Sequence, residues 1–168
     1  MKRKTVILIA LAVLLCIGVV GGSLFMTGNA DWLMYCFYHP DKIDSPEAAA
    51  VSFAELEIFL DGYSTVGFPA SFGCEEYALV LHDAAEAEGI KAAIVAVRDS
   101  GGLRPFHAFN AFATTDEGIV YVDSILGWDL GRCAIAELVD GVYVAKIEEG
   151  TYKKTNTLGC ERDFLIFW

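Results

Sequence analysis

The sequence predicts an α+β fold, in which helices pack on an antiparallel sheet and one transmembrane helix precedes them. Three features lead to this prediction. Residues 6–26 are uncharged and largely apolar, two segments before residue 90 carry helix start and stop signals with a helical apolar stripe in the second, and short apolar or alternating segments follow residue 90. We therefore expect a membrane anchor or signal segment at 1–30, a juxtamembrane linker at 31–45 and one domain at 46–168.

The N-terminal segment has the features of a membrane anchor. Three basic residues at 2–4 precede 21 residues without a charge, 6–26, which are enough to cross the ~30 Å hydrocarbon layer as a helix. Basic flanks favour the cytoplasmic side, so we expect a single-pass protein whose body lies outside the cytoplasm. Secretion after cleavage near Ala30 is the alternative, although the apolar run is longer than that of a signal peptide.

The remainder of the chain is strongly acidic. The full sequence has 12 basic and 23 acidic residues, and without the basic residues at 2–4 the net charge is −14. This charge repels phosphate backbones, so we expect no nucleic-acid partner. We expect the acidic residues mainly to form a solvated surface, although their charge would also favour cationic substrates such as lysine-containing peptides. About 138 residues follow residue 30, which suffices for one domain with its own core.

Two helices are expected at the start of the domain. The first begins at Ser45, where a capping serine, a proline and a glutamate follow one another, and it ends near Gly62. A loop at 63–73 leads to the second helix, which begins at about Cys74 and ends at Gly89.

Strands are expected to follow the second helix. Their segments are bounded by turn residues and are rich in apolar side chains. The predicted elements are strands at 91–98, 106–114 and 119–123 with a hairpin turn at 115–118, then a short helix at 133–139 and strands at 142–147 and 164–168.

Cys74 is the first candidate for chemistry. At the start of a helix, a thiol faces backbone N–H groups that the helix does not use, and the positive end of the helix dipole favours the thiolate. The same N–H groups suit the oxyanion of a tetrahedral intermediate. A small buried cysteine in the core is the alternative interpretation.

His107 and Asp123 are candidates for a triad with Cys74. His107 lies in the middle strand of the meander, and Asp123 ends the next strand, where an unpaired buried carboxylate would be costly. A turn centred on 116–117 pairs Asp123 with Asn110, three positions from His107, and a bulge would change this by one or two residues. If ring and carboxylate meet diagonally, Asp123 orients the ring and stabilises its charged form.

Three blocks of the sequence resemble the transglutaminase-like superfamily, whose Cys–His–Asp core follows the logic of papain-like proteases. These blocks are GCEEYALVLHDAAEAEGIKAAIV, HAFNAF and GIVYVDS, within about residues 50–130. The resemblance implies that Cys74 is the nucleophile, His107 the general base and acid, and Asp123 the orienting carboxylate. One departure is that His107 is followed by Ala-Phe, where many members have Ala-Trp.

The activity that this resemblance implies is thiol-dependent acyl transfer on peptide or protein amides. Hydrolysis by a peptidase or amidase is favoured over crosslinking, and we expect no cofactor. A non-catalytic binding or structural module of the same superfamily, tethered to the membrane, is the alternative. A small anchored scaffold protein in which Cys74 only fills the core is a further one.

Two aromatic residues are candidates for substrate binding. The resemblance implies a further oxyanion donor upstream of Cys74, for which Tyr63 or a backbone N–H within 70–74 is the candidate. Trp128 is a candidate for the wall of the substrate cleft, with packing against the sheet as its alternative.

The remaining histidines and cysteines have less specific patterns. His82 and Glu86 have a spacing that could bind a metal, but a third ligand is lacking, so we expect an exposed helix face and no metal site. Outside the cell, Cys133 and Cys160 could form a disulfide, and Cys36 would leave an odd thiol, so the sequence does not set the pairing.

Overall fold

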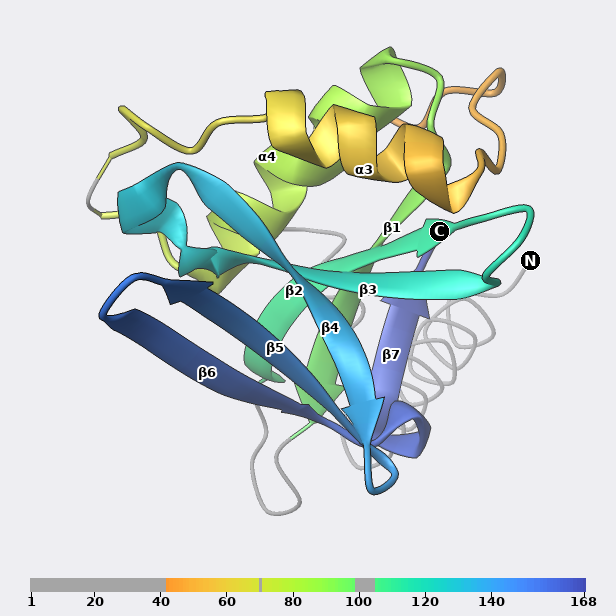
Figure 1. Ribbon diagram of the computed structural model, residues 1–168. Helices are drawn as coiled ribbons and strands as arrows, with labels where there is room; N and C mark the ends of the chain where they lie inside the picture. Colours follow the sequence, from red (N-terminus) through yellow and green to blue (C-terminus); the bar gives the residue numbers. More distant parts are fainter. Residues whose placement is uncertain (1–41, 70, 99–104) are drawn as a thin grey trace, which may run out of the picture. The chain divides into compact units, whose positions relative to one another are not determined.

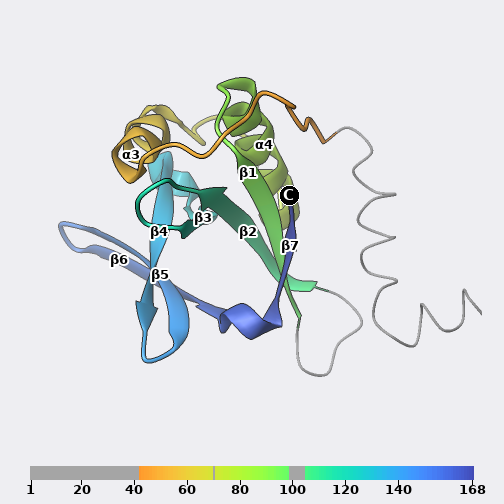
Figure 2. The same ribbon diagram turned by 90° about the vertical axis from the view of Figure 1, so that its right-hand side faces the viewer.

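The computed structural model describes residues 42–69, 71–98 and 105–168, which belong to one unit, Lys42–Trp168. Its main element is a seven-stranded antiparallel sheet in the order β6-β5-β4-β3-β2-β1-β7 (Figure 1). Two α-helices, α3 (Phe53–Gly62) and α4 (Cys74–Ala87), lie on one side of it (Figure 2). The strands are β1 (Ala92–Arg98), β2 (Pro105–Ala113), β3 (Ile119–Gly127), β4 (Arg132–Val139), β5 (Val142–Glu149), β6 (Tyr152–Gly159) and β7 (Phe164–Phe167), with 3-10 turns η1 (Trp128–Leu130) and η2 (Glu161–Asp163).

The sheet has an apolar core on each face. The first core lies between the sheet and the helices, where Leu56 and Leu81 pack against Phe112. The second lies on the opposite face, where the sheet curves on itself. Tyr143 on β5 and Phe164 on β7 have ring centroids 5.9 Å apart, although four strands separate β5 from β7 in the sheet order. Burial on both faces explains why β1 is a continuous apolar run.

The predicted α+β fold class, with a transglutaminase-like or papain-like core, is wrong. The described residues form a mainly β fold, in which one seven-stranded antiparallel sheet far outweighs two α-helices. The reason is that segment 133–139, expected as a helix, is strand β4, and segment 152–159, expected as no element, is strand β6. Residues such as Ala and Glu favour a helix only weakly, and pairing of β4 with both β3 and β5 overrides that preference.

The expected transmembrane helix lies outside the described residues. The anchor or signal segment at 1–30 and most of the linker at 31–45 fall within residues 1–41, and the same holds for Cys36. Among the described residues, from 42 onward, no helix is long and apolar enough to cross a membrane.

The first helix begins seven residues later than its predicted first helical position. Residues 46–51 run alongside the sheet instead, with bridges from Ala49 to Ile90 and from Val51 to Thr114. Ser52 then caps α3, and its reciprocal hydrogen bonds with Glu55 form a capping box. The helix starts later than predicted because Ser52 forms a complete capping box with Glu55. The residues before it are extended, and their backbone bridges to Ile90 and Thr114 instead. The second helix begins at Cys74, as the sequence predicted.

Candidate active site

The start of α4 places Cys74 at the edge of an aromatic cluster. The loop before it packs Phe68 and Phe72 against Tyr77 of the first turns of α4, with ring centroids 5.7 and 5.8 Å from the Tyr77 ring. Tyr77 is buried, and Cys74, one turn earlier, is half-buried. The cluster therefore fixes the entry to the helix while the thiol keeps access to solvent.

The first turn of α4 supplies free backbone donors near Cys74. Gly73 is the N-cap, and its own N–H donates to Glu76 Oε2 at 2.8 Å. The N–H groups of 74–76 have no acceptor within the helix, as at any helix start. The carboxylates of Glu75 and Glu76 also lie in this first turn, where the positive end of the helix dipole favours negative charge.

Asn110 fixes α4 to the sheet. Its side chain is fully buried on β2, and Nδ2 donates to the carbonyl oxygen of Ala78 at 2.8 Å and to that of Ala93 at 3.4 Å. Ala78 lies one turn after Cys74. Because the same residue contacts α4 and the strand next to β2, it sets the height of Cys74 above β2 and hence above His107.

The register between β2 and β3 brings His107 and Asp123 to the same face. Asn110 pairs with Val122, one residue from the predicted pairing with Asp123. Since neighbouring residues of a strand point to opposite faces, this one-residue difference changes the face that Asp123 occupies. Continuing the observed register sets Asp123 opposite Phe109, two residues from His107. Nε2 of His107 lies 3.1 Å from Asp123 Oδ2.

Asp123 is a fully buried carboxylate with four donors. Backbone N–H groups of Ile125 and Leu126 donate to Oδ1 at 3.0 and 3.1 Å, while His107 Nε2 and Asn156 Nδ2 donate to Oδ2 at 3.1 and 2.8 Å. Burial alone would raise the pKa of Asp123. The hydrogen bonds and the imidazolium charge outweigh burial and hold that pKa below its ordinary range.

Cys74 and Asp123 both contact the His107 ring. Burial opposes the charged ring, but hydrogen bonds to Asp123 and to Cys74, with the negative charge of both, raise the pKa of His107 to about 9. The structure thus brings together the three side chains that the sequence singled out, in the order Cys74, His107, Asp123.

The sequence did not indicate Asn156, the fourth member of this cluster. Its Nδ2 lies 2.8 Å from Asp123 Oδ2 and 3.2 Å from His107 Nε2. The residue belongs to β6, whose sequence YKKTNTLG has no apolar alternation. Along β6, half-buried residues alternate with exposed ones. The amino-acid types do not follow this alternation, so the sequence alone does not indicate it.

Tyr63 and Trp128 lie apart from this row of hydrogen bonds. The Tyr63 hydroxyl is buried without a hydrogen-bond partner among the described residues, and the ring packs on Phe59 and Phe68. Burial raises the pKa of Tyr63. Trp128 begins η1 with 42% of its surface exposed, and its carbonyl oxygen accepts a hydrogen bond from Thr65. Trp128 is therefore open to solvent, as a residue of a binding surface must be.

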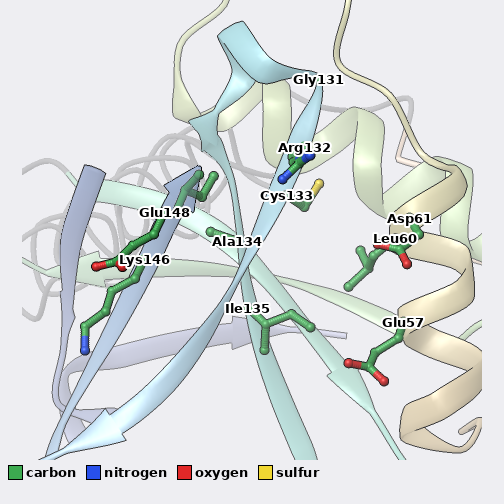
Figure 3. A pocket seen from close by; sticks show the side chains of 11 residues that line it. Glu57, Leu60, Asp61, Gly131, Arg132, Cys133, Ala134, Ile135, Lys146 and Glu148 are labelled. Carbon is green, nitrogen blue, oxygen red and sulfur yellow. The ribbon is translucent and has the colours of Figure 1, made fainter. Parts of the chain in front are cut away.

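A hollow of about 620 Å³ separates α3 from β4 and β5 (Figure 3). Glu57 and Asp61 on α3 line one side and Cys133 and Ile135 on β4 line another. Burial, with the charge of Asp123, raises the pKa of Cys133 to about 12, so this thiol stays protonated. None of Cys74, His107 and Asp123 lines the hollow.

His82 and Glu86 are buried, contrary to the expected exposed helix face. Glu86 accepts hydrogen bonds from the backbone of Ser45 and Ala92, both at 2.9 Å, and so ties the segment before α3 and the start of β1 to α4. No group of three or more potential metal ligands occurs among the described residues. Cys133 and Cys160, candidates for a disulfide, are both free.

Comparison with known proteins adds no relative. No family model matches the chain, and no curated protein or solved structure is significantly similar to it.

Proposed function

We propose that the protein performs thiol-dependent acyl transfer on peptide or protein amides, with hydrolysis, as by a peptidase or amidase, favoured over crosslinking. The observation that carries this proposal is the row of hydrogen bonds from Cys74 through His107 to Asp123. A nucleophile, a base within hydrogen-bond reach and a group that orients the base form the arrangement that activates thiols.

In the first step, the Cys74 thiolate attacks the carbonyl carbon of the amide, and the C=O electron pair moves to oxygen. Backbone N–H groups at the start of α4 stabilise the resulting oxyanion. The imidazolium of His107 gives a proton to the leaving nitrogen, the C–N bond breaks, and a thioester remains. Asp123 keeps the ring oriented and stabilises its positive charge before the proton leaves.

In the second step, water attacks the thioester carbonyl while His107 takes a proton from it. The C–S bond breaks, an acid is released, and the thiolate is restored beside the imidazolium. An amine in place of water would give a new amide by the same route. The acceptor alone therefore distinguishes hydrolysis from transamidation.

Attachment to the membrane through residues 6–26, with the body outside the cytoplasm, belongs to the same proposal and rests on the uncharged run and its basic flank.

Site-resolved alkylation tests the activated thiol. The full chain is treated with iodoacetamide at pH 7, and mass spectrometry follows modification of the peptide that contains Cys74. We expect the wild type to react about tenfold or more faster than the H107Q variant, because loss of the imidazolium removes the thiolate partner. Cys133 serves as the internal control and should react slowly in both proteins.

Substrate turnover tests the acyl transfer itself. Peptide amides are incubated with the wild type and with C74A, and the mass of the intact protein is followed for a thioester adduct. We expect an adduct and peptide loss with the wild type only. Equal, slow alkylation of wild type and H107Q, together with no adduct, would favour the non-catalytic module instead.

A further inference from the structure

Asn156 contacts both partners of the His107–Asp123 hydrogen bond. Its Nδ2 is 2.8 Å from Asp123 Oδ2 and 3.2 Å from His107 Nε2. The amide must present Nδ2 and not its oxygen, because two acceptor oxygens 2.8 Å apart would repel each other. Since Nδ2 accepts no hydrogen bond, Asp123 Oδ2 is the acceptor left for the Nε2 proton.

The two carboxylate oxygens of Asp123 are held by different parts of the chain. Oδ1 is held locally, by the N–H groups of Ile125 and Leu126. Apart from the ring, Asn156 is the side chain that binds Oδ2. Asp123 is fully buried and His107 is 9% exposed, whereas Asn156 is half-buried. Asn156 is therefore the most exposed of the three residues.

Strand β6 holds Asn156 in this position. Alternate residues of β6 face inward, and Tyr152 and Lys154 bind Asp129 of η1 through contacts of 2.8 and 3.1 Å. The next inward residue is Asn156, and the one after it, Leu158, is fully buried in the core. Anchors on both sides leave the Asn156 amide little freedom to turn away.

We propose that Asn156 is a positioning residue, whose amide keeps the Asp123 carboxylate turned towards His107 and excludes water from the hydrogen bond between them. The role concerns the site of the proposed acyl transfer and rests on that function. Asn156 acts through Asp123 and His107 and does not touch the reacting atoms. Without it, water would compete for Oδ2 and weaken the attraction between carboxylate and imidazolium.

Histidine titration tests this role without a substrate. The full chain is labelled with ¹⁵N-histidine, and the His107 imidazole is followed by NMR across pH. We expect the pKa of His107 to fall by about one pH unit in N156A, because water weakens its pairing with Asp123. T155A is the matched control, since Thr155 is the exposed neighbour on the same strand and should leave the titration unchanged.

A second variant keeps the test decisive if N156A does not fold. N156S is smaller and leaves room for water beside Asp123 Oδ2, so the pKa of His107 should fall in this variant as well. An unchanged titration in N156A or in N156S, or an equal fall in T155A, would each overturn the inference. If the wild type forms a thioester but the titrations contradict the inference, only the role of Asn156 is refuted. If the titrations come out as expected but no thioester forms, only the proposed function is refuted.

Discussion

The charge of His107 is decided by two neighbours that come from different elements. Asp123 on β3 contacts Nε2, and Cys74 on α4 also interacts with the ring. Burial is the largest single effect and opposes the protonated imidazole, but the two neighbours together outweigh it, which is why the pKa of His107 rises to about 9. At neutral pH the ring is therefore an acid, ready to protonate a leaving group.

This raised pKa predicts how stability depends on pH. Below the ordinary histidine pKa of 6.5, the ring is protonated in both folded and unfolded chains, so its contribution is fully present. As pH rises towards 9, only the folded chain keeps the proton, and the contribution is lost. We expect the free energy of unfolding, measured with urea, to fall by roughly 2–3 kcal/mol between about pH 6.5 and 9.5.

The H107Q variant is the control for this measurement. It lacks the titrating ring but keeps all other groups that titrate in the same range, so its unfolding free energy should change much less with pH. Equal slopes for the two proteins would show that His107 does not carry the effect.

The sequence singled out three residues of the candidate site but not the fourth. Cys74 follows a Gly-containing loop, His107 interrupts an apolar strand and Asp123 closes one, so each stands out from its surroundings. Asn156 stands among other polar residues and does not. Its role depends on curvature of the sheet, which brings β6 next to β3 and which no local pattern encodes.

At the scale of elements, Gly127 at the end of β3 is the described glycine at which an added Cβ would meet the closest neighbour. A Cβ added at Gly127 would collide with Ile147 Cδ1 and would lie 2.7 Å from the carbonyl oxygen of Arg132. The side chain of Ile147 could rotate away from the added atom, but the backbone carbonyl of Arg132 could move only if β4 moved with it. This glycine therefore allows β3 to pass into η1 while β5 closes over it.

The substitution G127A tests this close approach. We expect it to lower the free energy of unfolding by about 1–3 kcal/mol, because the added methyl group forces β3, β4 and β5 apart. Chemical denaturation measures the change. The matched control is G62A, where nothing lies within 4 Å of the added atom and stability should be unchanged or slightly raised. Equal losses in both variants would contradict the assignment.

Elements with strong local signals were predictable, and those defined by long-range pairing were not. The apolar run of β1 and the helical period from Cys74 are local, and both gave the right element. Strand β4 carries residues that suit a helix equally well, and β6 has no distinguishing pattern. In both, hydrogen bonds to neighbouring strands decide the structure.

At the scale of the whole molecule, the acidic excess predicts a preference among substrates. The net charge of −14 outside the basic residues at 2–4 attracts cationic peptides. We expect kcat/KM for a lysine-containing peptide to exceed that for its glutamate-containing counterpart by about tenfold at low salt. The preference should shrink at about 0.5 M salt, where the Debye length is only a few ångströms. If the ratio of the two kcat/KM values does not change with salt, the preference comes from direct contacts of the peptide near Cys74 and not from the net charge.

The order of the strands has a consequence for biosynthesis. β7 pairs with β1, although β2 to β6 all leave the ribosome before it. Until β7 emerges, the nascent chain presents the backbone edge of an apolar strand, and such edges invite pairing with other chains. The open edge of β1 is thus covered only by the last strand of the sheet, and the sheet is complete only after nearly all of it has been made.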